Sequence, residues 1–197
     1  MRLLLARHGE TDWNVASKIQ GSTDTELNEV GKEQARQLGQ KLVMERIQID
    51  TIYTSKLKRA ALTAQIIGEM MGVDVEPVDG LEEINLGQWE GMRWSEVRNT
   101  YPEEYEEWYH NRRYYKVPNG ESYQDLLVRD LSVLKNIINE KINTALVVTH
   151  SANIVTLLAA INKVAFEDMF KKYKIENTSV IELDSKDIKN LDINITV

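Results

Sequence analysis

The sequence predicts an α/β fold in which helices cover both faces of a mostly parallel central sheet, a three-layer αβα arrangement. Two observations predict it. Short apolar runs alternate with amphipathic helices within the first 80 residues, and a later apolar run around residue 147 is followed at once by another helix. Units of this kind place their strands parallel, with right-handed crossovers. At 197 residues the chain has the size of one domain that buries a core without disulfides, and it contains no cysteine.

Apolar spacing defines each element of the first half. Short apolar runs indicate strands, and apolar residues three and four apart mark helical faces. Gly72 suits the left-handed conformation that often follows a helix end, and Pro77 places its strand near an edge of the sheet. In chain order the predicted elements are a strand at 3–6, a loop at 12–28, a helix at 29–45, a strand at 50–54, a helix at 60–71 and a strand at 73–78.

The second half interrupts this alternation and then resumes it. Residues 80–121 hold three of the four tryptophans and show helical patterns at 94–99 and 103–112. We interpret them as a mainly helical cap segment inserted over the strand ends of a single domain, residues 1–197. The run at 145–149 is rich in β-branched residues and predicts a central strand. The remaining predicted elements are a helix at 123–138, a helix at 153–161 and a final pair of strands at 179–183 and 188–195, joined by a turn near 185–186.

Composition and charge argue against several classes of function. The net charge of −7 disfavours broad electrostatic binding to nucleic acid or to an anionic membrane, so an anionic substrate requires a local cationic pocket. The opening apolar run is too short for a signal peptide, and no run approaches the roughly 18 to 20 residues of a membrane span. We therefore expect a cytoplasmic protein with neither nucleic acid nor membrane as a partner. No pattern indicates an oligomeric state.

Basic and imidazole side chains follow three of the predicted strands. Arg7 and His8 follow the first strand, Arg59 lies in the junction after the second, and His150 follows the central one. Each residue alone also fits a structural role, but the carboxyl ends of parallel strands meet at one edge of a sheet, where ligands bind. Each guanidinium group can bind two phosphate oxygens at once. The backbone N–H of Ser151, at a helix start, adds a further donor. A pair of arginines repels metal cations, so these residues favour a phosphomonoester over a metal.

After the first predicted strand the chain continues Arg7-His8-Gly9-Glu10-Thr11-Asp12-Trp13-Asn14, a stretch that resembles the signature of the histidine phosphatase superfamily. This family includes the cofactor-dependent phosphoglycerate mutases. The similarity continues in the family's order and covers essentially the whole chain. The further matching blocks are Gln20-Gly21, Ser55 to Ala64, Glu83 to Gly91 and Val147 to His150.

The resemblance implies phosphoryl transfer through a phosphohistidine intermediate. A carboxylic acid in the block after the third strand is expected to protonate the leaving group, and the Glu-x-x-x-Gly spacing to Gly87 selects Glu83 over its neighbour Glu82. The implied roles are His8 as nucleophile, Arg7, Arg59 and His150 as ligands of the phosphoryl oxygens, and Asn14, Gln20, Gly21 and Ser151 as further phosphate or substrate contacts.

We prefer a phosphomonoester hydrolase that acts on a small phosphorylated metabolite, without a metal or other cofactor. A sugar phosphate, a phosphoglycerate-like acid and α-ribazole phosphate all fit. The alternatives are a cofactor-dependent phosphoglycerate mutase and a non-catalytic phosphate-binding module. The turn at 118–122 resembles that of the small phosphatase members.

Two features depart from the family pattern. Ser151-Ala152-Asn153 stands where the family often has glycines. The cap segment is compact, and its main cationic cluster is Arg112, Arg113 and Lys116. We interpret that cluster as a solvated face, with a substrate clamp as the alternative.

Overall fold

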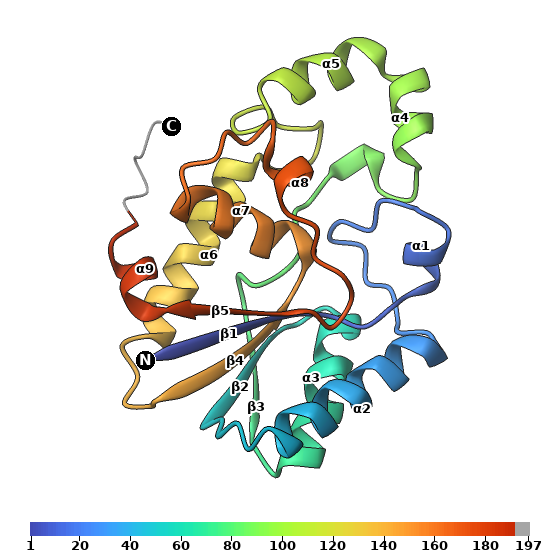
Figure 1. Cartoon of the computed structure of the whole chain (residues 1–197). Helices are drawn as coiled ribbons and strands as arrows, with labels where there is room; N and C mark the ends of the chain where they lie inside the picture. Colours follow the sequence, from blue (N-terminus) through green and yellow to red (C-terminus); the bar gives the residue numbers. More distant parts are fainter. Residues whose placement is uncertain (192–197) are drawn as a thin grey trace.

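The apolar runs assemble into a five-stranded mixed sheet with helices on both faces, as the sequence predicts (Figure 1). The computed structural model describes residues 1–191. Across the sheet the strands lie in the order β3-β2-β4-β1-β5. Their bounds are Arg2–Arg7 for β1, Thr51–Ser55 for β2, Val75–Val78 for β3, Thr144–Thr149 for β4 and Val180–Asp184 for β5.

The first four strands form the parallel part of the sheet. β4 pairs in parallel with β1 on one side and with β2 on the other, β2 pairs in parallel with β3, and β5 runs antiparallel to β1. β4 lies in the middle and all its residues are buried, which confirms the central strand predicted from the β-branched run. β3 is an edge strand, as predicted from Pro77, because proline has no N–H to offer to a further strand.

One face of the sheet is covered by two helices, α2 (Glu29–Met44) and α3 (Lys58–Met71). α2 packs on α3, and α3 packs on β2 and β4. The apolar faces predicted from spacing, with Leu38 on α2 and Ile67 on α3, form one buried cluster with the strands. Gly72 ends α3 with φ of 66°, the left-handed conformation expected there.

The other face is covered by α6 (Tyr123–Ile137) and α7 (Ser151–Ile161), with α9 (Ser185–Lys189) beside α6. α7 contacts β1, α6 and the short α8 (Met169–Lys172). It is apolar on nearly all sides, because it lies between these elements and buries nine of its eleven residues. Within residues 1–191, no helix combines the length and the apolar character needed to cross a bilayer.

The cap segment, residues 80–121, is built around its tryptophans. Trp108 packs edge-on against Trp89, with ring centroids 5.5 Å apart, and stacks on Trp94 at 4.9 Å. Trp89 and Trp108 belong to the same buried cluster as Leu3 of β1, so the cap segment shares one core with the α6 and α7 side of the sheet. Figure 1 shows α4 and α5 lying beyond α8, away from the strands. The helical elements of the segment are η1 (Gly87–Trp89), α4 (Trp94–Thr100) and α5 (Pro102–His110).

The prediction of a final pair of strands is wrong in its second half. Residues 185–189, predicted as a turn and the start of a strand, form α9. Asp184 and Asp187 make a capping box that satisfies the free N–H groups of this helix, a signal that outweighs the apolar alternation. Within the described residues, β5 pairs with β1. The part of the predicted strand at 192–195 lies outside the described residues.

Several local details also differ from the prediction. The predicted loop at 12–28 contains α1 (Asp12–Val15), which Thr11 and Asn14 stabilise with a capping box. α7 begins at Ser151, two residues earlier than predicted, and β3 begins at Val75. α8 was not predicted, because it has only four residues and too little periodicity to detect.

Candidate active site

The parallel pairing of β1 with β4 brings His8 and His150 together. Arg7 lies opposite Thr149 in the register, so the next residue of each strand is a histidine at the same edge of the sheet. The backbone N–H of His8 extends the pairing by donating to the Thr149 carbonyl at 3.0 Å. Both imidazoles are buried, with ring centroids 5.1 Å apart and ring planes at 58°. This is the convergence expected from the two strand ends.

His8 is held as a neutral imidazole with a free lone pair. Its Nδ1 lies 2.7 Å from the carbonyl oxygen of Gly9. A carbonyl oxygen only accepts, so the hydrogen-bond network assigns the ring proton to Nδ1. Within the described chain, Nε2 has no hydrogen-bond partner. Burial, together with the charges of Arg59 and Arg7, holds the pKa of His8 well below 6.5. Neutral imidazole is the form that can attack an electrophile.

His150 is oriented the other way. Its Nε2 lies 2.9 Å from the Ser55 hydroxyl, which also accepts the backbone N–H of Leu57 at 3.3 Å. We assign the Ser55 hydroxyl as the donor to Nε2, since this satisfies the serine proton. Nε2 is then an acceptor, so the proton of the neutral ring lies on Nδ1. Burial and the charge of Arg59 hold the pKa of His150 well below 6.5. The buried Nδ1 has no partner, so His150 presents an unpaired N–H beside His8, the kind of donor that binds an oxyanion.

Arg7 lies at the end of β1 and lines the same cavity as His8. Its Nη1 donates to the carbonyl oxygen of Ile175 at 2.6 Å, and its Nε is buried without a partner. Burial lowers the pKa of Arg7, but a guanidinium keeps its charge at any working pH. Arg7 therefore brings a fixed positive charge and an unused donor to the edge of the sheet.

Arg59 is fully buried on α3 and does not line the cavity. Its Nη1 donates to the Thr23 carbonyl and its Nη2 to the Gly21 carbonyl, each at 2.8 Å, while Nε has no partner. These bonds hold the loop that borders the cavity. The charge of Arg59 also acts at a distance, because it lowers the pKa of His8.

Two amide side chains lie at the cavity with their oxygens already bonded. The Asn14 oxygen accepts from the Thr11 N–H at 3.1 Å and from Asn177 Nδ2 at 3.4 Å. The Gln20 oxygen accepts from the hydroxyls of Thr11 at 2.9 Å and Thr25 at 2.5 Å. Both residues line the cavity, so their NH₂ groups are the parts left to bind a ligand. Asn177, which the sequence did not single out, helps to fix this orientation.

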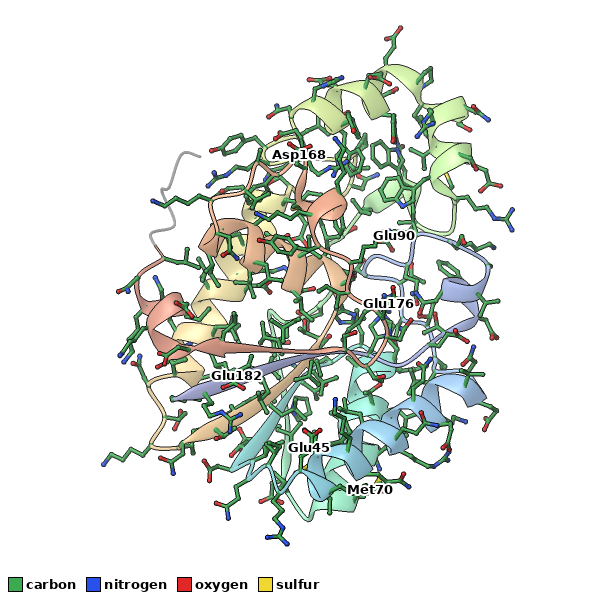
Figure 2. The ribbon with its side chains drawn as sticks, viewed as in Figure 1. Glu45, Met70, Glu90, Asp168, Glu176 and Glu182 are labelled. Carbon is green, nitrogen blue, oxygen red and sulfur yellow. The ribbon has the colours of Figure 1, made fainter. Side chains whose placement is uncertain are left out.

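Gly21 occupies a position that only glycine fills without strain. Its φ is 53°, and an added Cβ would lie 2.1 Å from Glu90 Oε1. Glu90 accepts the backbone N–H groups of Ser22 at 2.8 Å, Thr23 at 3.0 Å and Leu86 at 3.1 Å. Figure 2 shows Glu90 where the loop that follows α1 meets the cap segment. Glu90 thus ties the two together at the rim of the cavity, a role that the sequence did not predict.

Glu83 lies at the cavity and Glu82 does not. Glu83 accepts the backbone N–H of Ile84 at 3.0 Å, and the N–H of Ala152 lies 3.5 Å from its other oxygen. Burial raises the pKa of Glu83, and this effect is larger than the lowering by the positive charges of Arg59 and Arg7. Glu82 instead accepts the backbone N–H of Gly80 at 2.7 Å. Of the two glutamates that the sequence offered, Glu83 is therefore the one whose carboxyl group lies at the cavity.

A cavity of about 170 Å³ lies at this edge of the sheet, lined by His8 but by neither His150 nor Arg59. Larger hollows of about 390 and 500 Å³ lie elsewhere on the surface, but neither is lined by His8 or Arg7. An aromatic wall faces the polar groups, and its only signal in the sequence is the abundance of aromatic residues in and after the cap segment. The polar lining comes from Arg7, His8, Asn14, Lys18, Gln20, Glu83 and Ser151, and the aromatic wall from Trp94, Tyr123 and Phe170.

The cationic cluster of the cap segment is not a solvated face, and that interpretation is wrong for two of its three members. Arg112 and Arg113 are buried. The guanidinium of Arg112 lies 4.4 Å from the Trp108 ring centroid and packs against several aromatic rings, which shield it from water. Lys116 is exposed and pairs with Asp125 at 2.9 Å. Some of their aromatic partners are neighbours in the chain, but the fold alone brings Phe170 to Arg112 and Phe166 to Arg113.

This edge of the sheet offers a neutral nucleophilic imidazole, a fixed cation and a carboxyl group around one small cavity, the equipment of a phosphoryl-transfer site in an α/β protein. Within residues 1–191, no group of three or more histidine, aspartate or glutamate side chains is placed to hold a metal ion. The chain belongs to the histidine phosphatase superfamily. The family model described as histidine phosphatase superfamily (branch 1) matches residues 3–191.

Two named relatives and one solved structure align with nearly the whole chain. Phosphoserine phosphatase 1 of Hydrogenobacter thermophilus is 34% identical over 199 aligned positions, which cover 100% of this chain and 93% of that protein. Phosphoglycerate mutase-like protein 4 of Arabidopsis thaliana is 38% identical over 181 positions, 90% of this chain and 76% of that protein. The structure of mycobacterial glucosyl-3-phosphoglycerate phosphatase in complex with VO3 is similar with a TM-score of 0.81 at 30% identity, and the match covers 93% of this chain and 92% of that one.

Proposed function

We propose that the chain is a phosphomonoester hydrolase that acts on a small organic phosphate through a phosphohistidine intermediate on His8. The state of His8 carries this proposal. The Gly9 carbonyl binds the Nδ1 proton, so the lone pair of Nε2 remains available, and Glu83 lines the same cavity. The lowered pKa of His8 keeps that nitrogen unprotonated at neutral pH. Two-step ester hydrolysis needs a nucleophile and a proton donor at one site, and these residues supply them.

In the first step, His8 Nε2 attacks phosphorus, the P–O ester bond breaks, and the leaving oxygen takes the proton of Glu83. Arg7, the Nδ1–H of His150 and the amide of Asn14 stabilise the charge on the phosphoryl oxygens as the group moves. In the second step, Glu83, now a carboxylate, accepts a proton from water as that water attacks phosphorus. Inorganic phosphate leaves, and His8 and Glu83 return to their starting protonation states.

Glu83 must be protonated before the first step. Burial already raises its pKa, and a dianionic phosphate beside it raises that pKa further. We propose that the reaction uses no metal or other cofactor. Arg7 and Arg59 supply the positive charge that stabilises the phosphoryl oxygens, and the same two charges repel a metal cation.

The cavity supports a substrate of small size, in agreement with relatives whose names specify phosphoserine and glucosyl-3-phosphoglycerate. Trp94 and Phe170 line both this cavity and an adjoining hollow of about 400 Å³ that Arg112 borders. The Nε of Arg112 is buried without a partner. We propose that the non-phosphate part of the substrate extends into this hollow and that Arg112 binds an anionic group on it.

Trapping the intermediate tests the proposed mechanism. The wild-type protein and a His8→Ala variant are incubated with a ³²P-labelled phosphate ester and quenched in base, because phosphohistidine is acid-labile. We expect label on the wild-type protein and neither label nor turnover with His8→Ala. Label on His8→Ala that is lost in acid as from the wild type would place the nucleophile at another residue.

Product analysis separates hydrolysis from the alternatives. With 3-phosphoglycerate as substrate and 2,3-bisphosphoglycerate added, we expect release of phosphate to exceed isomerisation. Isomerisation much faster than release would identify a mutase. Failure to release phosphate from any ester of a broad panel of physiological phosphates would favour a phosphate-binding module.

A further inference from the structure

The main chain that carries Glu83 is held by side chains instead of by secondary structure. Residues 80–83 belong to no helix or strand, yet all four of their carbonyl oxygens accept a side-chain hydrogen bond. The donors come from α6, from the end of β4 and from α7. The bonds run from Arg129 to Gly80 at 2.9 Å and to Glu83 at 3.1 Å, from Thr149 to Leu81 at 2.8 Å, and from Asn153 to Glu82 at 2.9 Å.

Asn153 connects this segment to a further buried group. Its Nδ2 donates to the Glu82 carbonyl at 2.9 Å and to Asp130 Oδ1 at 2.8 Å. Asn153 and Asp130 are each 1% exposed. Both protons of the NH₂ group therefore have acceptors, and the side chain cannot rotate without losing one of them.

The environment of Asp130 is costly for stability. Asp130 Oδ2 and Asn153 Oδ1 are both buried without a partner. The guanidinium of Arg129 lies 3.7 Å from Asp130 Oδ1 but is directed to the carbonyls of the 80–83 segment and to Glu121. Burial raises the pKa of Asp130 to about 8, so the side chain is mostly a neutral acid at pH 7. Two apolar side chains in this place would avoid the buried unpaired oxygens, so packing alone does not explain the pair.

We propose that the Asp130–Asn153 pair positions Glu83 to protonate the leaving group. Asp130 fixes the amide of Asn153, Asn153 fixes the Glu82 carbonyl, and the side chain of Glu83 leaves the main chain at the next residue. Neither Asp130 nor Asn153 lines the cavity, so the pair acts through Glu83 and not on the substrate. This inference rests on the proposed function, in which Glu83 is the proton donor.

The test compares esters that differ in their need for a proton. Asn153→Leu removes both hydrogen bonds and fills the space with an apolar side chain. The matched control is Thr156→Val, because Thr156 is buried on the same helix three residues later and makes no hydrogen bond to the 80–83 segment. The substrates are glycerol 2-phosphate, whose alkoxide needs a proton, and p-nitrophenyl phosphate, whose leaving group is stable without one.

With Asn153→Leu we expect kcat for glycerol 2-phosphate to fall about 10- to 100-fold, because misplacing Glu83 loses part of the rate that general-acid catalysis supplies. We expect kcat for p-nitrophenyl phosphate to fall less than about threefold, because its leaving group needs no proton. Thr156→Val should leave the ratio of the two rates unchanged. Asp130→Asn, whose oxygen can still accept from Asn153, should keep a near wild-type ratio, whereas Asp130→Leu should reproduce the effect of Asn153→Leu.

Equal losses on both esters for a folded Asn153→Leu protein overturn the proposal, as does the same change of ratio with Thr156→Val. If circular dichroism shows that Asn153→Leu does not fold, Asn153→Ser decides by the same ratio, since a hydroxyl has one proton and can donate to only one of the two acceptors. A wild-type protein that hydrolyses neither ester refutes the proposed function. A wild-type protein that hydrolyses both through His8, with an unchanged ratio in the Asn153 variants, refutes the positioning role alone.

Discussion

His8 and His150 lie side by side with ring centroids 5.1 Å apart, yet each uses a different ring nitrogen for its hydrogen bond. His8 binds the Gly9 carbonyl through Nδ1, and His150 binds the Ser55 hydroxyl through Nε2. The first ring is left with a free lone pair and the second with a free N–H. Two residues of one type thus differ in what they offer to a ligand, because their backbone and side-chain partners differ, and we propose that they act as nucleophile and oxyanion donor.

Replacement of Glu83 by glutamine should separate esters by their leaving groups. Glu83→Gln keeps the shape of the side chain but removes the acidic proton, so we expect kcat for alkyl phosphates to fall about 10²- to 10⁴-fold and kcat for p-nitrophenyl phosphate to fall far less. Rates for a series of aryl and alkyl phosphates measure this dependence. Glu82→Gln is the control and should stay within about twofold of wild type. A uniform loss across the series would assign the proton donor to another residue.

The ionisation of His8 should be visible directly by NMR. Burial and the arginine charges lower its pKa, so His8 should stay neutral down to pH values well below 6.5, and the acidic limb of kcat/KM should lie there too. Arg59→Met removes a positive charge and should move the His8 pKa upward, whereas Arg59→Lys should retain most of the depression. Titration of the imidazole ¹⁵N signals gives both values. A wild-type His8 that titrates at or above 6.5 contradicts the neutral nucleophile.

Arg112 should discriminate between substrates that differ by one anionic group. O-phosphoserine and O-phosphoethanolamine differ by a carboxylate, and we expect wild-type kcat/KM to favour phosphoserine by about tenfold or more, the worth of one charge-assisted hydrogen bond. Arg112→Met keeps the length of the side chain and should abolish the preference mainly by lowering kcat/KM for phosphoserine. Lys116→Met removes an exposed cation of the same segment and should change neither rate. An unchanged preference in Arg112→Met would exclude this residue from substrate binding.

Gly21 and Gly72 allow strain and close contact to be compared. Both have positive φ, 53° and 66°, but an added Cβ meets Glu90 at Gly21 and nothing within 4 Å at Gly72. Gly72→Ala should lower the free energy of unfolding by about 1 kcal/mol, the cost of the left-handed conformation. Gly21→Ala should cost about 1 to 3 kcal/mol more, because Glu90 must also move. Urea unfolding measures both, and equal costs would mean that Glu90 yields without loss of its hydrogen bonds.

The parts of the fold that the sequence predicts are those with local signals. The β-branched run at 145–149 indicated the central strand, Pro77 the edge strand and Gly72 a helix end, because each reflects the conformation of its own few residues. The convergence of His8 with His150 follows from the same logic, since parallel strands have a common carboxyl edge. α9 was missed because its capping residues outweigh a weak apolar alternation.

By itself, the sequence determined the strand ends and the residue types that they carry, and so the chemistry at the edge of the sheet. Tertiary structure alone decided how those groups are oriented and what surrounds them. Glu90 binds a loop nearly 70 residues away, Asn153 binds the Glu82 carbonyl, and the Arg112 guanidinium lies over the Phe170 ring. Such contacts join segments far apart in the chain, and no local pattern records them, because hydrogen bonds and burial depend on what the folded backbone places nearby.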